Sequence, residues 1–522
     1  MRHTLCPRHT PPSRRVLAAS LALVLGLGGV LDAAAMPPGT TASVRMPGEH
    51  SLELLASLQR APSGWLENAS EQELALAIVT GDVPSHWSAS TTATVHQVSN
   101  CNDSGAGSLR AVIASSSVVS GDTVSIKGLD CDFALASPIP IDQDTLTIEG
   151  DVLGYGELDS VITAAPGNQS GLLRHSGTGT LYLRSLRIED GKKYKSDDDK
   201  YAAGACISST GNVSLSSSLV RGCVARNNGS GGARGGAVAA AGVVTLLHSS
   251  VLDNDAYVLN GRALGGGLFA AGGVGMKYST LWGNTAYVAD AGSGAGYGGA
   301  IYAGTDGFSG NSIIQRSTLA FNSADFAGAL YVREGSVDIN TTTIHGNKSA
   351  HSNAMSGAVM LLEPVSALIR NSTFTRNKNQ GAVHPGGLGV RLPHGTVTLE
   401  SSIFSGNTGL AGQPNDLLKI PNSPAFAGSH NLIGEAGASL VPADTIRQIN
   451  TPMTDFSQHG DTYGAIPAAG SWAFNLGAFD AGPLDPETDQ SEAPRRVGTG
   501  VDIGALESDA LFIGRFEDPP LY

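Results

Sequence analysis

The sequence is poor in charged and aromatic side chains. Charged residues make up 15% and aromatic residues 6% of its 522 residues, whereas soluble domains carry about 25% charged residues. Basic residues are fewer than acidic ones, 32 against 46, and the formal net charge is therefore −14. A chain of this sign repels phosphate backbones, so we expect no nucleic-acid partner. A hydrophobic content of 41% excludes a chain that is disordered throughout.

Long apolar runs are scarce as well. The run at residues 16–31 follows four arginines and precedes three alanines, an order typical of a signal peptide, which we assign to residues 1–35. Its removal takes out four arginines and one aspartate and changes the formal charge from −14 to −17. No other run reaches the ~18 residues of a membrane helix. We therefore predict an exported chain, extracellular or at the bacterial outer surface, without a transmembrane helix in its mature form.

Cysteine is rare, with five residues in the chain. Cys6 lies in the predicted signal peptide, and the other four are an even number in an oxidising compartment. Their proximity in the sequence predicts the disulfides Cys101–Cys131 and Cys206–Cys223, one of three connectivities. Buried, unpaired cysteines are the alternative.

Long helices are disfavoured by 68 glycines and 25 prolines, and a repeat is present instead. A segment of the form Ser/Thr-x-apolar-x-x-Asn recurs, with its asparagines 30, 38, 25, 30 and 30 residues apart. These asparagines are Asn254, Asn284, Asn322, Asn347, Asn377 and Asn407. Cys223 and Gly191 occupy the same slot one and two periods earlier. A second, glycine-rich motif precedes each slot from Cys223 onward, as in Gly-Gly-Ala-Val at 235–238 and Gly-Gly-Ala-Ile at 298–301.

The two motifs together select the architecture. Residues two apart share a face of a strand, and the segments are short, rich in β-branched residues and without a 3.6-residue apolar stripe. Coils of about thirty residues would stack with equivalent residues ~4.8 Å apart. We therefore predict an all-β fold, a right-handed parallel β-helix (solenoid) with an N-terminal cap and an irregular C-terminal region.

Three ladders follow from this architecture. The asparagines would form a buried amide ladder, and the glycines would occupy corners that need positive φ or no Cβ. The predicted core stripe comprises Val220, Val251, Leu281, Leu319, Ile344, Phe374 and Phe404.

The predicted organisation has six parts. They are a signal peptide (1–35), a partly helical leader segment (36–92), an N-terminal cap with the first coils (93–180), the repeats (181–410), a closing region (411–507) and a tail (508–522). A helix starting near Leu109 fits the cap, which would hide an open sheet edge. The period is lost from Asn415 onward, and we expect the closing region to cover the other end of the solenoid.

The chain also resembles a known group of proteins. Gly-Gly-Ala-Ile at 298–301 and Phe-x-x-Asn at 374–377 resemble the repeats of polymorphic outer-membrane-protein β-helices. Gly-Ser-Leu-Arg-Ala-Val-Ile at 107–113 and Val-Asp-Ile-Gly-Ala-Leu-Glu at 501–507 resemble bacterial choice-of-anchor Q domain proteins, over about residues 95–507. The chain departs from that group at 473–477 and in the charged insertion 192–200. The resemblance implies a secreted or surface β-helix and no established reaction.

Catalytic and metal-binding patterns are weak. Glycoside hydrolysis needs two carboxylates roughly 5–9.5 Å apart, and the outward columns beside the repeat contain none. His345 and His384 lack partners at metal spacing, and Asp197-Asp198-Asp199 lacks the alternation of a calcium loop. We predict no catalytic residue on this face, no metal and no cofactor.

One surface suggests binding. Tyr278 and Trp282 on one coil, flanked by His248 and Arg316, are suited to stacking on sugar rings. The alternative is an aromatic pair that lies under the long loop 284–298. The predicted function is an exported, monomeric scaffold for adhesion or carbohydrate contact without catalysis, with a polysaccharide or cell-surface partner. The alternatives are a polysaccharide lyase or glycoside hydrolase, and a purely structural envelope protein.

Overall fold

The structure is a computed structural model. It describes residues 93–151, 158–196, 200–290, 294–305, 310–381, 384–391, 395–419, 426–436, 441–442, 444–459, 462–468, 470–478, 488–495 and 500–508. The predicted signal peptide and leader segment, Asp197-Asp198-Asp199 and the tail beyond residue 508 lie outside the described residues.

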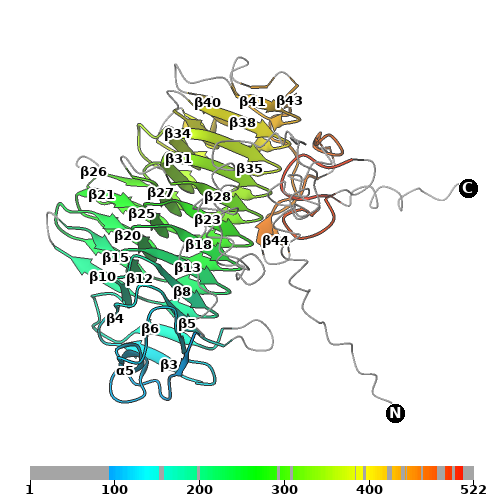
Figure 1. Ribbon diagram of the computed structural model, residues 1–522. Coiled ribbons are helices and arrows are strands. Elements are labelled where there is room, and N and C mark those ends of the chain that lie inside the picture. Colours follow the sequence, from blue (N-terminus) through cyan, green and yellow to red (C-terminus); the bar gives the residue numbers. More distant parts are fainter. Residues whose placement is uncertain are drawn as a thin grey trace, which may run out of the picture. The chain divides into compact units, whose positions relative to one another are not determined.

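The described chain folds as a parallel β-solenoid, which confirms the predicted fold class (Figure 1). A central coil visits a four-stranded sheet, two successive rows of a twenty-stranded sheet, a twelve-stranded sheet and a seven-stranded sheet, in that order. The strands pair in parallel with their equivalents in the next coil, as between Val220 and Val251. A side chain therefore lies directly above its counterpart one period earlier in the sequence.

Two of the sheets carry one short strand per coil. The twelve-stranded sheet comprises β3 (Asp132–Leu135), β6 (Val161–Ala164), β9 (Arg187–Glu189), β14 (Leu219–Arg221), β19 (Ser250–Leu252), β24 (Thr280–Trp282), β29 (Thr318–Ala320), β32 (Thr343–His345), β35 (Thr373–Thr375), β39 (Ile403–Ser405), β42 (Leu432–Ile433) and β43 (Ile446–Arg447). The seven-stranded sheet comprises β10 (Lys192–Lys195), β15 (Val224–Asn227), β20 (Asp255–Val258), β25 (Thr285–Val288), β30 (Ser323–Ala324), β33 (Lys348–Ser349) and β36 (Lys378–Asn379).

The twenty-stranded sheet has two rows that β31 (Leu330–Asn340) and β34 (Val359–Arg370) join, because each is long enough to span both. The first row comprises β4 (Ile139–Ile141), β7 (Leu173–His175), β12 (Ile207–Ser209), β17 (Val238–Ala240), β22 (Leu268–Ala270), β27 (Ile301–Ala303), β37 (Leu388–Val390) and β40 (Leu417–Lys419). The second row comprises β1 (Val95–Gln97), β2 (Thr123–Ser125), β5 (Leu146–Glu149), β8 (Thr180–Arg184), β13 (Asn212–Ser216), β18 (Val244–Leu247), β23 (Val274–Lys277), β28 (Ser312–Gln315), β38 (Thr396–Glu400) and β41 (Ala427–Ser429).

The remaining elements are short. The four-stranded sheet comprises β11 (Ala202–Ala203), β16 (Ala233–Arg234), β21 (Gly261–Leu264) and β26 (Gly294–Tyr297), and the others are α5 (Leu109–Ile113), the 3-10 turn η1 (Leu410–Gly412) and the antiparallel pair β44 (Ser457–His459) and β45 (Thr462–Gly464). The segment 284–298, which we expected to be a long loop, therefore contains β25 and β26. Among the described residues, no helix has the length and apolarity that crossing a membrane requires.

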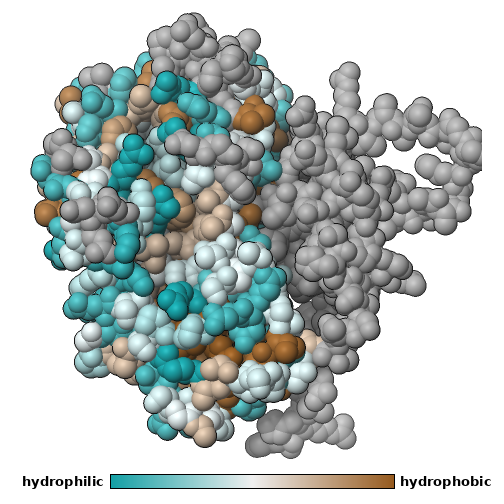
Figure 2. Space-filling view, turned by 60° about the vertical axis from the view of Figure 1, so that its left-hand side comes forward, coloured by the Kyte–Doolittle hydropathy of each residue, from teal (hydrophilic) through white to brown (hydrophobic). Residues whose placement is uncertain are grey.

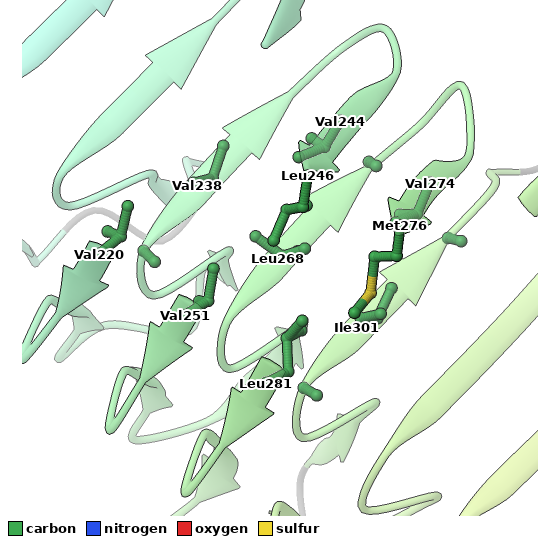
Figure 3. Close-up of a cluster of buried hydrophobic side chains, with 14 of the residues drawn as sticks. Val220, Val238, Val244, Leu246, Val251, Leu268, Val274, Met276, Leu281 and Ile301 are labelled. Carbon is green, nitrogen blue, oxygen red and sulfur yellow. The ribbon is translucent and has the colours of Figure 1, made fainter. Parts of the chain in front are cut away.

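The predicted core stripe is confirmed. Each of its seven residues is fully buried, and Figure 3 shows Val220, Val251 and Leu281 stacked along it. A second set, including Val238 and Leu268, projects into the same interior from the first row of the twenty-stranded sheet. The interior of the solenoid is therefore one continuous apolar core.

The ladder asparagines are buried and joined by their side chains. Asn284 Oδ1 accepts hydrogen bonds from the backbone N–H and the Nδ2 of Asn254 at 3.2 and 2.9 Å. The same pair of bonds recurs at each step up to Asn407. Each Nδ2 also donates to a carbonyl of the preceding coil, as from Asn284 to Val251 O at 2.9 Å. Each buried amide is thereby satisfied within the solenoid.

The glycines of the second motif have two different roles. Gly235 has φ +56°, whereas a Cβ on Gly236 would lie 2.2 Å from Gly266 O. The first position of the motif thus needs a left-handed backbone, and the second needs the absence of a side chain.

The N-terminal cap contains the expected helix and the first disulfide. Ser108 accepts a hydrogen bond from Ala111 N at 3.2 Å and so caps α5, whose Leu109 and Ile113 are buried in the core. Both predicted disulfides are present, with Cα–Cα distances of 6.2 Å for Cys101–Cys131 and 5.8 Å for Cys206–Cys223.

The closing region differs from the expectation that it covers the far end. Its first part adds β40 to β43 to the solenoid, and the part from about Thr451 lies along the outer face of the twelve-stranded sheet (Figure 1). The reason is that this face is a column of threonines, Thr318, Thr343 and Thr373, whose hydroxyls bond the returning chain. We call residues 451–508 the returning segment.

Candidate functional site

The structure places three of the four predicted binding residues in one column. The rings of His248 and Tyr278 are stacked, with centroids 4.8 Å apart, and Arg316 Nη1 donates to the Tyr278 hydroxyl. Glu492 from the returning segment also bonds Tyr278, whose pKa is raised by burial. His248 is exposed, whereas Tyr278 and Arg316 are half-buried.

Trp282 belongs to a different cluster at the other end of β24. Its ring centroid lies 4.5 Å from that of Phe321, 5.7 Å from that of Phe456 and 5.4 Å from that of Tyr463. Phe456 also stacks on His345 at 4.2 Å, and burial lowers the pKa of His345 to about 4. Two of these rings come from the returning segment, so that segment covers Trp282, in place of the expected loop 284–298.

The outer face between these two clusters is closed by hydrogen bonds. Gln490 Nε2 donates to Thr318 Oγ1 at 2.9 Å, and Gln490 Oε1 accepts from Thr343 Oγ1 at 2.6 Å. Thr318 Oγ1 donates to Tyr463 O at 2.6 Å. The returning segment therefore packs against this face, and Trp282 beside it is half-buried.

The returning segment also carries a buried charged network. Arg495 Nε lies 3.3 Å from Glu507 Oε1, and both side chains are 3% exposed. Glu507 Oε2 accepts from Asp502 N, and Asp489 accepts from Glu507 N. Burial raises the pKa of Glu507 to about 8 against the opposite effect of Arg495, and the nearby carboxyls of Asp502 and Asp489 add smaller effects in the same direction as burial. These contacts hold the turns of the returning segment together. We interpret the network as a structural feature that helps this segment pack on the solenoid.

A more accessible aromatic site lies on the outer face of the seven-stranded sheet. Arg226, Tyr257 and Tyr287 occupy equivalent positions on β15, β20 and β25. The guanidinium carbon of Arg226 lies 4.6 Å from the Tyr257 ring centroid, and the two tyrosine rings are 5.9 Å apart. Tyr287 is 48% exposed.

These three side chains border an open groove. We define the tyrosine groove by its lining residues, which are Val224, Arg226, Asp255, Ala256, Tyr257, Thr285 and Tyr287. Its volume is about 260 Å³, below the 300–1,000 Å³ of ordinary small-molecule pockets. Such a groove suits a ligand that lies across the surface and continues beyond it.

Two polar side chains, Asp255 and Thr285, line the tyrosine groove beside apolar ones. Asp255 is hydrogen-bonded to the Thr285 side chain, and burial raises the pKa of its carboxyl. With Asp255 and Thr285 beside the two phenol rings, the groove offers hydroxyl-binding groups next to aromatic faces. That pairing is suited to sugars, which present hydroxyls at the edge and C–H groups on the face of each ring.

Sequence reasoning missed this groove although a signal was present. The pentapeptide Asn-x-Ala-Tyr-Val occurs at 254–258 and again at 284–288, and it begins each time with a ladder asparagine. The residues after the asparagine were not assigned to a strand, and their common outward face was therefore not recognised.

Other polar and aromatic groups do not make a comparable site. No group of His, Cys, Asp and Glu in the described part of the chain is arranged to hold a metal ion. Phe269, Tyr302 and Tyr331 stack on the outer face of the twenty-stranded sheet, but each is less than 9% exposed and packs in a secondary apolar cluster. The two glutamates Glu334 and Glu363 are register partners on β31 and β34.

Comparisons with known proteins leave the chain without an assigned family. No protein-family model and no curated protein matches it. One similar solved structure is described as a mannuronic acid specific polysaccharide family 6 lyase enzyme from human gut microbiota. It shares 12% identity, covers 67% of this chain and 91% of its own, and has a TM-score of 0.30. A likeness at this level carries no argument about activity.

Proposed function

We propose that this protein is an exported β-solenoid scaffold that contacts polysaccharide through the tyrosine groove without catalysis. The observation that carries this proposal is the column of Arg226, Tyr257 and Tyr287 along one open groove. Aromatic rings supply apolar area next to a polar group at low conformational cost. The parallel stacking of coils places such rings in a row, which suits a polymer with a repeating unit.

Export is supported by the two disulfides, because such bonds persist in oxidising compartments. We also propose membership of the choice-of-anchor Q group. The motifs that carry this resemblance have structural roles here, since Ser108 caps α5 and Glu507 joins the network of the returning segment. A scaffold that displays a surface agrees with such roles.

The first test is a binding measurement on the purified chain with both disulfides formed. Retention on immobilised acidic and neutral polysaccharides is measured for the wild type and for Tyr257→Ala/Tyr287→Ala. We expect the double variant to lose affinity about tenfold or more, because it removes both aromatic faces. Trp472→Ala, which removes another exposed aromatic ring, is the matched control and should bind as the wild type does.

Product release is followed in the same samples. New reducing or unsaturated ends would contradict a non-catalytic role and would direct mutagenesis to Glu334 and Glu363. Absence of retention on every polymer would contradict carbohydrate contact and favour the structural envelope protein. Unchanged retention by the double variant would move the contact away from the tyrosine groove.

A further inference from the structure

Charge is strongly segregated within this molecule. The seven strands β10, β15, β20, β25, β30, β33 and β36 contain five lysines and one arginine, and Asp255 is their single acidic residue. The chain as a whole carries a formal charge of −14. The strands of the sheet that bears the tyrosine groove are therefore more basic than the chain as a whole.

Three of the lysines face outward and continue the groove in both directions. Lys192, Lys348 and Lys378 are exposed and stand in the same register column as Asp255. Seven coils separated by ~4.8 Å give this column a length of about 29 Å. Figure 2 brings forward the side on which Figure 1 labels β10, β15, β20 and β25, and hydrophilic side chains cover much of it.

A second group of cations lies near the β10 end. Lys193 Nζ donates to Ser170 O at 2.7 Å, and burial lowers the pKa of Lys193, with the charges of Lys195 and Arg174 adding to the shift. Like charges are thus held close together there.

Five aspartates lie in or beside the strands of this sheet. Asp255 lies in the groove itself, Asp190 and Asp253 are exposed at the corners that lead into β10 and β20, and Asp290 and Asp325 follow β25 and β30. Asp253 and Asp255 form no salt bridge with a described lysine or arginine of the seven-stranded sheet. The outward cations of the strands are therefore not neutralised by these two carboxylates.

We infer that the ligand of the tyrosine groove is an anionic polysaccharide, which lies along the solenoid axis with its carboxylates near Lys192, Arg226, Lys348 and Lys378. This inference rests on the proposed function and adds the class of polymer. The tyrosines supply contact with the sugar rings, and the cations supply long-range attraction and selection by charge. The two contributions can be separated, because only the second depends on salt.

The test compares two polymers with one backbone. The dissociation constants of polygalacturonate and its fully methyl-esterified form are measured with the disulfide-bonded chain at low and high salt. We expect polygalacturonate to bind about tenfold or more tightly at low salt and to lose that advantage at high salt. The ester should bind with little dependence on salt.

Lysine variants outside the groove identify which cations attract the anionic polysaccharide. Lys192→Gln/Lys348→Gln/Lys378→Gln should weaken polygalacturonate binding about tenfold at low salt and leave ester binding unchanged. Lys127→Gln/Lys277→Gln/Lys419→Gln changes the total charge equally, outside the seven-stranded sheet, and should affect neither polymer. Tyr257→Ala/Tyr287→Ala should weaken both.

The outcomes separate this inference from the function on which it rests. Equal, salt-independent binding of both polymers would overturn the inference and leave the proposed function intact. Binding of neither would overturn both. If Lys192→Gln/Lys348→Gln/Lys378→Gln still binds polygalacturonate more tightly than the ester, the cations that select the anionic polymer do not lie on this sheet. Equally tight binding of duplex DNA or of anionic lipid vesicles would replace selection for a polysaccharide with general polyanion attraction.

Discussion

The position of the ladder asparagine is taken by other residues toward the ends of the ladder. At the asparagine slot, Cys223 N donates to Asn254 Oδ1, and Asp416 Oδ1 accepts from both the N–H and Nδ2 of Asn407. The amide ladder therefore ends at a disulfide on one side and at a buried carboxyl on the other. Gly191 fits one period earlier because a Cβ there would lie 2.6 Å from Cys206 Sγ. Burial raises the pKa of Asp416 to about 7.

Extension of the ladder should partly replace the disulfide at Cys223. We expect Cys206→Ala/Cys223→Ala to lower the free energy of unfolding by about 3 kcal/mol, the value for a closed loop of this size. Cys206→Ala/Cys223→Asn should recover part of that loss, because the new amide can donate to Asn254 Oδ1. Urea unfolding of the three proteins measures the difference. Equal stability of the two variants would contradict the equivalence of the slot.

The corners between strands follow two different rules. Before the twelve-stranded sheet, nine successive corner residues have positive φ and none is glycine, from Ser185 at 54° to His430 at 55°. After that sheet, glycine alternates with a larger residue. A Cβ on Gly283 would lie 2.2 Å from Asp253 Oδ1, and one on Gly346 would lie 2.7 Å from Phe321 Cε1. The side chain of one corner thus occupies the space that a Cβ of the next would need.

Relief of backbone strain at a corner is testable on adjacent serines. Ser217 is exposed and has φ +46°, so Ser217→Gly should raise the free energy of unfolding by about 0.5–1 kcal/mol. Ser216 ends β13 with an extended backbone, and Ser216→Gly should lower it by a similar amount, about 0.5–1 kcal/mol. Urea unfolding of both variants is the measurement. If both variants lower the free energy of unfolding, the backbone at Ser217 is not strained.

Within the part of the chain that the structure describes, the returning segment determines which face of the solenoid is covered. It covers the threonine column and Trp282, and it leaves the seven-stranded sheet open. Its docking depends on Gln490, whose amide satisfies the hydroxyls of two neighbouring coils, and on the Arg495–Glu507 network. The face chosen for binding in the sequence analysis is therefore largely an internal packing surface.

Docking of the returning segment should weaken in alkali. The pKa of Glu507 rises from 4.5 to about 8 on burial, so the protonated form favours docking. Its stabilisation is complete below the ordinary pKa and is lost as the pH rises through 8. Hydrogen exchange of residues 500–508, corrected for intrinsic rates, should be faster relative to the solenoid at pH 9 than at pH 6. Glu507→Gln should remove this difference, and a dependence that persists in the variant would exclude Glu507 as its source.

Much of the architecture could be predicted from the sequence because the interactions that define it repeat. Asn254, Asn284 and their equivalents mark the same position in many coils, so their spacing shows the length of the repeat. The even number and close spacing of the cysteines predicted both disulfides. The path of the returning segment could not be predicted in this way, because the contacts that dock it, such as those of Gln490 with Thr318 and Thr343, occur once and join residues more than a hundred positions apart.

The sequence by itself determined that the chain forms a parallel β-solenoid, which residues line its core and which carry its ladder. Only the tertiary structure decided which outer face stays accessible. Outward side chains need not be the same from one coil to the next, because they do not fill the common core. Their exposure depends on a segment that packs across several coils. The returning segment packs on Trp282 and leaves Tyr287 48% exposed, although both stand in the same coil.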